Sequence, residues 1–134
     1  MIIKRISQVF LGLMALAFCK TGIEALIDPQ AVLANVGIEL NNTAALSSMR
    51  AVYGGMHVMF GLFCAWGIFK NQSAALVLII LYTTGFVAGR LVSWTADGTP
   101  NDFVITWLIV EAFSLNVCAA LLFLIRNREK ATTP

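Results

Sequence analysis

Ionisable side chains interrupt the hydrophobic stretches of this sequence. In RAVYGGMHVMFGLF, residues 50–63, an arginine, a tyrosine and a histidine follow one another closely. A buried imidazole or carboxylate can move a proton, and a guanidinium binds the oxygens of carboxylates and phosphates with two parallel hydrogen bonds. Such residues within apolar helices mark functional sites in membrane proteins. The candidate site residues are Lys20, Glu24, Arg50, Tyr53, His57, Arg90 and Glu111.

Helical spacing brings several candidates onto common faces. Arg50, Tyr53 and His57 follow one another at intervals of three and four residues, so they share one face of a helix. Lys20 and Glu24 are one helical turn apart. Counted at about 1.5 Å per residue from the basic end of each hydrophobic stretch, all the ionisable candidates lie in the same half. The sequence therefore predicts a polar pocket that opens toward one side of a membrane.

The residue types of this pocket suggest its ligand. Arg50 and Arg90 at the mouth would hold a carboxylate, sulfonate or phosphate, and apolar residues below would hold a tail or a ring. The first expectation is a small amphipathic molecule, anionic and lipid-like. The second is a quinone that accepts hydrogen bonds from Tyr53, His57 or an arginine.

Other roles for these residues stay open from the sequence. Glu111 with His57 or Tyr53 could transfer protons, as in a membrane isomerase or cyclase. Arg50 and Arg90 could instead extend to lipid headgroups, and His57 could simply pack. We therefore assign no catalytic residue, and whether the protein is an enzyme stays open.

No pattern for a metal, a haem or a nucleotide occurs in the sequence. His57 is the only histidine, and neither H-E-x-x-H nor C-x-x-C is present. The sequence also lacks G-x-S-x-G and a glycine-rich phosphate loop. Cys19, Cys64 and Cys118 lie inside hydrophobic stretches, where we expect them to pack without forming disulfides. Apart from the quinone, no cofactor is evident.

Four hydrophobic stretches must position the candidates. Each is near the roughly 20 residues that cross the hydrocarbon core as a helix, and 59% of the 134 residues are hydrophobic while 12% are charged. We expect an all-α integral membrane protein, a four-helix bundle that forms one domain over residues 1–134, with its N-terminal stretch retained as the first span. The predicted spans are 6–27, 49–69, 73–92 and 102–125, with a short amphipathic helix at about 29–36 on the outer surface.

Basic residues indicate the orientation of the spans. Lys4 and Arg5 precede the first span, Lys70 lies between the second and third, and three more basic residues follow the last. The other two connections contain no lysine or arginine. The positive-inside rule therefore predicts cytoplasmic termini and an outward-facing pocket. This asymmetry also accounts for the net charge of +2, so we expect membrane lipids and not nucleic acid as partners.

Gly85 and Gly89 form a G-xxx-G pattern on the third span. Small residues at this spacing are typical of helices that pack closely in lipid. We expect these two glycines to contact another helix of the same chain. A homodimer face, or a face for a membrane protein partner, is the alternative.

Three sequence motifs resemble a known family. RAVYGGMHVMFGLF, GFVAGRLVSWTADGTP and the glutamate of WLIVEAF are similar to motifs of small bacterial four-helix membrane proteins. These proteins form the branch of the DoxX-like superfamily known as domain of unknown function 4345. The resemblance implies a bacterial inner-membrane protein with no established activity. It assigns Arg50, Tyr53, Arg90 and Glu111 to the family motifs but leaves out Lys20 and His57.

The wider superfamily adds one functional expectation. It includes a membrane subunit of a thiosulfate:quinone oxidoreductase, so the resemblance implies quinone binding or a role as an accessory subunit of a redox or other membrane complex. A small dimeric transporter is a further alternative. The apolar half of the spans nearer the cytoplasm argues against a path from one side to the other.

Overall fold

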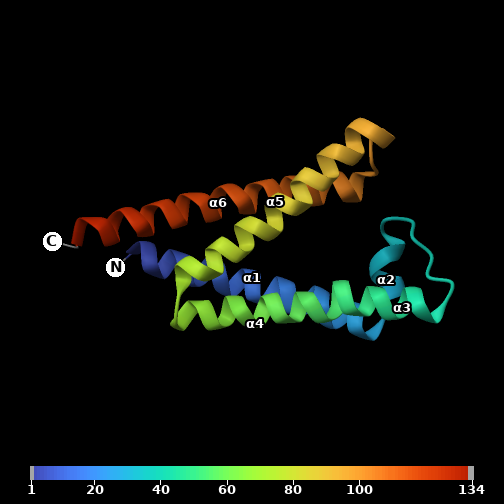
Figure 1. Cartoon of the computed structure of the whole chain (residues 1–134), viewed down its shortest axis with the longest axis horizontal. Coiled ribbons are helices and arrows are strands. Elements are labelled where there is room, and N and C mark those ends of the chain that lie inside the picture. Colours follow the sequence, from blue (N-terminus) through green and yellow to red (C-terminus); the bar gives the residue numbers. More distant parts are fainter. Residues whose placement is uncertain (1, 133–134) are drawn as a thin grey trace.

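The chain folds almost entirely into helices (Figure 1). The computed structural model describes residues 2–132, and no strand occurs in this part of the chain. Four helical segments are long and apolar enough to cross a membrane. The prediction of an all-α protein with four such helices is therefore confirmed. The segments are α1 (Ile2–Ile27), Thr43–Phe69, α5 (Gln72–Asp97) and α6 (Asp102–Thr132).

Three helical pieces make up the second long segment. α3 (Thr43–Met49) begins after Asn42, whose side chain accepts a hydrogen bond from the Ala45 amide at 2.8 Å. It continues without a break into η1 (Arg50–Gly55) and α4 (Met56–Phe69). The helical segment therefore begins before the predicted residue 49, because Asn42 supplies an earlier N-cap.

η1 is a stretch of π-helix inside this segment. The amide of Met56 donates to the carbonyl of Ala51, five residues earlier, where an α-helix would use the carbonyl four residues earlier. A π turn takes up an extra residue. Side chains before it therefore point in directions that α-helical spacing does not predict.

A short helix connects α1 to α3. α2 (Pro29–Ala34) starts after Asp28, whose carboxylate accepts a hydrogen bond from the Ala31 amide at 3.1 Å, and a proline occupies its first position. Gly37 follows with a φ of 73°, a backbone conformation that favours glycine. The helix covers residues 29–34 of the predicted stretch 29–36.

α1 packs closely along η1 and α4, and α5 packs along α6. Glycines allow the approach of α1 to α4. A Cβ on Gly22 would lie 2.7 Å from the backbone nitrogen of Val58, and a Cβ on Gly61 would lie 2.9 Å from the backbone oxygen of Ala15. Both distances are shorter than real Cβ contacts, so these glycines determine how closely the two helices lie.

The two ends of the bundle differ. Both chain termini and the connection between α4 and α5 lie at one end, here called the terminal end (Figure 1). α2, α3 and the connection between α5 and α6 lie toward the other end, the distal end. The helices meet around a buried apolar cluster in the terminal half, and α5 separates from α4 toward the distal end (Figure 1). The cluster consists of Leu11, Ala15, Phe18, Cys64, Ala75, Leu76, Ile79, Cys118, Leu121 and Ile125.

Candidate functional site

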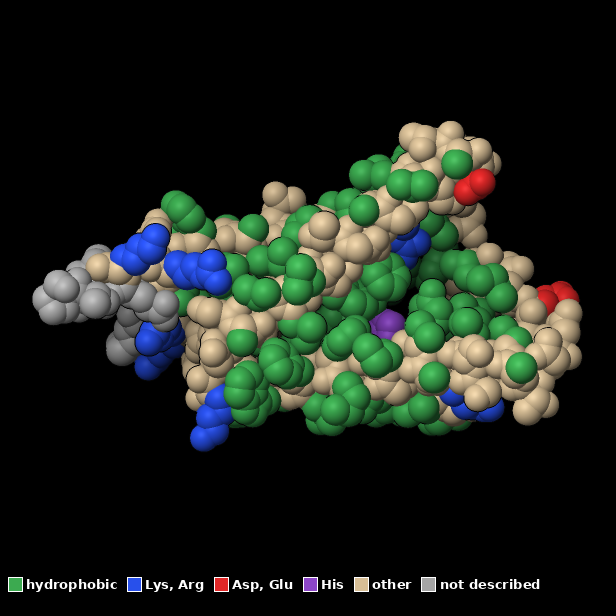
Figure 2. Space-filling view, in the orientation of Figure 1, with side chains coloured by type: hydrophobic (Ala, Val, Ile, Leu, Met, Phe, Trp, Pro, Cys, Tyr) green, Lys and Arg blue, Asp and Glu red, His purple; other side chains and the backbone are tan. Residues whose placement is uncertain are grey.

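A cavity lies where the helices separate. It has a volume of about 1430 Å³ and is lined by side chains of α1, α2, η1, α4, α5 and α6. Figure 2 shows it as a hollow between α5 and the α3–α4 segment, with the chain's single histidine inside. At the distal end the Asn101 amide donates to the carbonyl of Asn35 at 3.1 Å and so bridges the two sides. Figure 2 looks onto the open side of the cavity, between the helices.

An ion pair between α5 and α6 lies on one wall of the cavity. Arg90 Nε donates to one oxygen of Glu111 at 2.7 Å, and Nη2 donates to the other at 2.9 Å. The guanidinium carbon also lies 5.7 Å from the centre of the Phe86 ring. Glu111 is only 8% exposed, and the bidentate pairing with Arg90 stabilises its charge there.

A second hydrogen-bonded pair links α4 to α5 at the cavity. His57 Nε2 lies 2.7 Å from the Tyr82 hydroxyl, and Nδ1 lies 3.2 Å from the carbonyl oxygen of Val52. A carbonyl oxygen only accepts, so Nδ1 carries the hydrogen. His57 is 6% exposed, and no carboxylate of the described residues bonds to its ring. Because an unpaired buried charge is costly, the ring is neutral, and the Tyr82 hydroxyl donates to Nε2.

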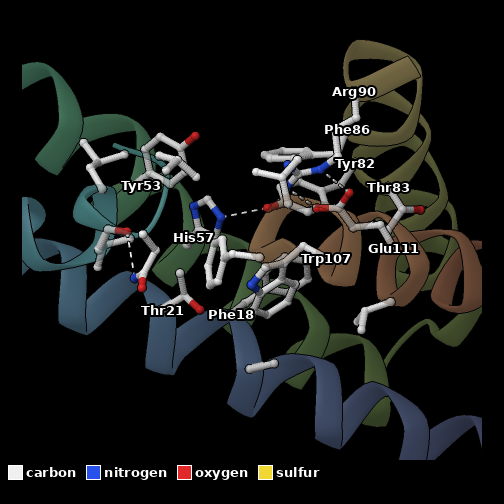
Figure 3. A pocket seen from close by; sticks show the side chains of 18 of the residues that line it. Phe18, Thr21, Tyr53, His57, Tyr82, Thr83, Phe86, Arg90, Trp107 and Glu111 are labelled. Atoms are coloured by element: carbon white, nitrogen blue, oxygen red, sulfur yellow. Dashed lines mark hydrogen bonds and ion pairs between the residues drawn. The ribbon is translucent and has the colours of Figure 1, made fainter. Parts of the chain in front are cut away.

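Aromatic rings surround these polar groups (Figure 3). Tyr53 stacks on His57, with 5.6 Å between ring centres and 14° between ring planes. Phe18 of α1 packs edge to face on Tyr82, with 4.9 Å between the ring centres. The Phe86 and Tyr82 rings, both on α5, have their centres 4.6 Å apart. This packing restricts the His57 and Tyr82 rings and so holds the two partners of the hydrogen bond in place.

Lys20 and Glu24 of α1 also line the cavity, at a more exposed position. They form an ion pair of 2.7 Å, and their side chains are 73% and 52% exposed. An exposed pair one helical turn apart contributes little to stability. The pairing nevertheless neutralises both charges at the rim of the cavity.

Arg50 is not among the lining residues, in contrast to the prediction from helical spacing. Its Nε donates to the carbonyl of Leu26 at 3.0 Å, at the C-terminal end of α1. A helix end presents unpaired carbonyls and a partial negative charge, which a guanidinium stabilises. The π-helix explains the difference, because its extra residue per turn rotates Arg50 away from the face that holds His57.

The positive charges that line the cavity are therefore paired. They belong to Lys20 and Arg90, and each is bound to a carboxylate. Of the two arginines predicted at the mouth, Arg90 lines the cavity, whereas Arg50 binds the C-terminal end of α1. An anionic ligand thus lacks one of the two partners expected for it.

Gly85 and Gly89 line the cavity as well. No atom lies within 4 Å of the place where a Cβ on either residue would stand. The expectation that these glycines contact another helix of the chain is therefore wrong. Their missing side chains instead leave room along α5 for a bound molecule.

Three aromatic side chains of the site were not among the sequence candidates, namely Phe18, Tyr82 and Phe86. The spacing contained a signal for two of them, because Tyr82, Phe86 and Arg90 follow one another at intervals of four residues. Phe18 gives no such signal, since the rings that it contacts belong to other helices.

The chemistry available at the site is hydrogen bonding above apolar walls. Within the described residues, no three His, Cys, Asp or Glu side chains are placed to hold a metal ion. The cysteines are free, and Cys64 and Cys118 belong to the buried apolar cluster. The Tyr82 oxygen and the Arg90 N–H groups beyond those bound to Glu111 are among the groups that a ligand head could bind.

Comparison with known proteins identifies a family. The model of the family described as Domain of unknown function (DUF4345) matches residues 6–125. Among curated proteins and among solved structures, none matches the chain. The matched region contains every candidate residue and the whole lining of the cavity. The resemblance to this branch is confirmed, and the wider DoxX-like relationship stays a prediction.

Proposed function

Since the chain belongs to the DUF4345 family, whose description names no activity, we propose a function from the cavity itself. The protein binds a small amphipathic molecule, with its polar head at the Tyr82–His57 and Arg90–Glu111 pairs and its tail along the apolar walls. One observation carries this proposal, namely two hydrogen-bonded polar pairs on one large, mainly apolar cavity. Ligand sites have this composition of apolar walls with a few convergent polar groups.

The size of the cavity supports a lipid-like ligand. Sites for drug-sized molecules have volumes of about 300–1,000 Å³, and this cavity has about 1430 Å³. It opens sideways between helices that are long and apolar enough to cross a membrane (Figure 2). In a membrane that side faces lipid, so the molecule reaches the cavity from the bilayer.

The pairing of charges favours a neutral head. A carboxylate or phosphate would have to share Arg90 with Glu111, and the two anions would repel each other. A neutral oxygen can instead accept from the three Arg90 N–H groups that have no acceptor among the described residues. The quinone-like ligand expected from the sequence belongs to this neutral class, and the anionic ligand has less support.

The location that we propose is a bacterial inner membrane, with both termini in the cytoplasm. Most lysines and arginines on the visible face gather at the terminal end (Figure 2), and basic residues are enriched on the cytoplasmic side of membrane proteins. The cavity then opens in the outer half of the bilayer.

Three other functions are compatible with four spans. A small dimeric transporter needs a path through the terminal half, which the buried apolar cluster fills. An enzyme of the isomerase or cyclase type would use the Tyr82–His57 pair on a molecule bound in the same cavity. An accessory subunit of a larger membrane complex would contact a partner protein and need no ligand. The volume of the cavity favours ligand binding over this last role.

Native mass spectrometry of the protein in a mild detergent tests the proposal. Wild type should retain a small hydrophobic molecule, which extraction then identifies. Gly85→Leu should lose it, because the leucine fills part of the cavity at a point where no atom lies within 4 Å of the new Cβ. Ala88→Leu introduces the same side chain on the same helix at an exposed position outside the lining, and it should retain the molecule.

Two results would refute the proposal. Wild type that carries nothing, but copurifies with another membrane protein, would replace it with the accessory-subunit function. Equal retention by Gly85→Leu and Ala88→Leu would place the bound molecule on the outer surface of the helices.

A further inference from the structure

Taking the proposed ligand site as its basis, we propose that the head of the ligand is a hydroxyl that donates its hydrogen to the Tyr82 oxygen. The ligand is then a membrane-soluble alcohol or phenol, a class that includes quinols. Ketones, ethers and quinones only accept hydrogen bonds, so they bind more weakly. Tyr82 and His57 together determine this specificity.

The backbone sets the direction of the hydrogen bonds at the site. Reversing the bond to Tyr82 would move the His57 hydrogen from Nδ1 to Nε2 and would break the bond to the Val52 carbonyl at 3.2 Å. Val52 lies within η1, which ends at Gly55, two residues before His57. The direction of the hydrogen bond between Tyr82 and His57 is therefore set by the local backbone before any ligand binds.

The Tyr82 hydroxyl has a single hydrogen, and His57 already binds it. The Tyr82 oxygen lies 2.7 Å from His57 Nε2, to which it donates its hydrogen. Toward the cavity the oxygen can therefore only accept a hydrogen bond. Among the described residues, no donor is bonded to that oxygen. A molecule that uses this position has to supply the hydrogen itself.

Arg90, on the same helix as Tyr82, offers hydrogen-bond donors instead of an acceptor. Its N–H groups beyond those bound to Glu111 can only donate. A hydroxyl-bearing head has both the hydrogen that the Tyr82 oxygen can accept and the lone pairs that the Arg90 N–H groups need. A ketone either leaves the Tyr82 oxygen unused or takes the Tyr82 hydrogen and leaves His57 Nε2 unsatisfied. The loss of one hydrogen bond of this kind weakens binding by about tenfold.

Tryptophan fluorescence can measure the preference. Trp107 lines the cavity, and a Trp66→Phe/Trp94→Phe background leaves it as the only tryptophan. The probes are brominated 16-carbon chains that end in a primary alcohol, a methyl ether or a methyl ketone. Each is titrated into phosphatidylcholine nanodiscs that contain the protein, and bromine that contacts Trp107 quenches its emission.

The proposal predicts a distinct pattern across three variants in this background. The background protein should bind the alcohol about tenfold more tightly than the ether or the ketone. Tyr82→Phe should weaken the alcohol alone. His57→Leu should strengthen the ketone, because it releases the Tyr82 hydroxyl to donate to the ligand. Thr84→Val, an exposed substitution on the same helix outside the lining, should change nothing.

The possible failures of the two proposals differ. Equal affinities for the three probes, unchanged in Tyr82→Phe, would overturn the hydroxyl inference and leave the ligand site standing. A preference for the ketone that Tyr82→Phe removes would also overturn it, since the tyrosine would then be the donor. Absence of quenching by all three probes would overturn both the inference and the lipid-like ligand.

Discussion

At the scale of single residues, the two arginines that were both predicted at the mouth of the pocket have different roles because their acceptors differ. Arg90 binds the carboxylate of Glu111 in a largely buried position, whereas the exposed Arg50 binds the backbone carbonyl of Leu26. Removing one partner of a buried ion pair leaves an uncompensated charge. Removing a donor from an exposed helix end leaves a carbonyl that other donors can reach.

Alanine substitutions of the two arginines should therefore lower the free energy of unfolding by different amounts. We expect Arg50→Ala to lower the free energy of unfolding by about 1 kcal/mol, the value of one hydrogen bond. We expect Arg90→Ala to lower it by about 3 kcal/mol, because Glu111 loses its partner. Unfolding by sodium dodecyl sulfate in mixed micelles, followed by circular dichroism, measures both. An Arg90→Ala/Glu111→Ala double variant should recover part of the loss, and equal losses in the two single variants would contradict the argument.

Glu111→Gln tests how the ion pair determines the charge of the ligand. The glutamine keeps the shape of the side chain but removes the negative charge beside Arg90. A brominated 16-carbon fatty acid should then quench Trp107 at about tenfold lower concentration than in the parent protein, because the guanidinium can bind the carboxylate. Lys20→Gln at the rim is the control and should not improve binding. A fatty acid that binds no better to Glu111→Gln would show that Arg90 does not contact the head.

At the scale of helices, the sequence predicted the four spans because apolar runs of about 20 residues allow few other structures. Spacing also placed Arg90, Glu111, Tyr53 and His57 in one half of the spans, and the structure brings all four to one cavity. Composition does not reveal the π-helix of η1, so the position of Arg50 could not be predicted.

The glycines show the same limit of sequence patterns. A small-residue spacing indicates that a helix can be approached, but it does not identify what approaches it. Gly22 and Gly61 meet the backbone of another helix, whereas Gly85 and Gly89 face the cavity. The difference depends on where neighbouring helices lie, which a pattern within one helix does not contain.

Alanine substitutions should separate these two kinds of glycine. Gly22→Ala places a Cβ 2.7 Å from the Val58 nitrogen, and backbone cannot move aside without shifting a helix. We expect it to lower the free energy of unfolding by about 2 kcal/mol, as overpacked sites do. Gly85→Ala has no atom within 4 Å of its Cβ, so stability should be kept or slightly raised. Detergent unfolding of both variants measures this, and a larger loss for Gly85→Ala would contradict the packing described.

At the scale of the whole molecule, the two halves of the bundle serve different purposes. The terminal half contains the buried apolar cluster and holds the helices together. The distal half is hollow and carries the polar pairs (Figures 2 and 3). The orientation in the membrane then decides which leaflet supplies molecules to the cavity.

Cysteine labelling of the intact membrane tests this orientation. Asn41 and Asn127 are exposed, one in the distal connection between α2 and α3 and one near the C-terminal end of α6. If the termini are cytoplasmic, a membrane-impermeant maleimide should label Asn41→Cys in intact bacterial spheroplasts and Asn127→Cys only after permeabilisation. Wild type is the blank, because its three cysteines lie inside the helices. The reverse order would place the cavity in the cytoplasmic half of the bilayer, and the ligand would then come from the inner leaflet.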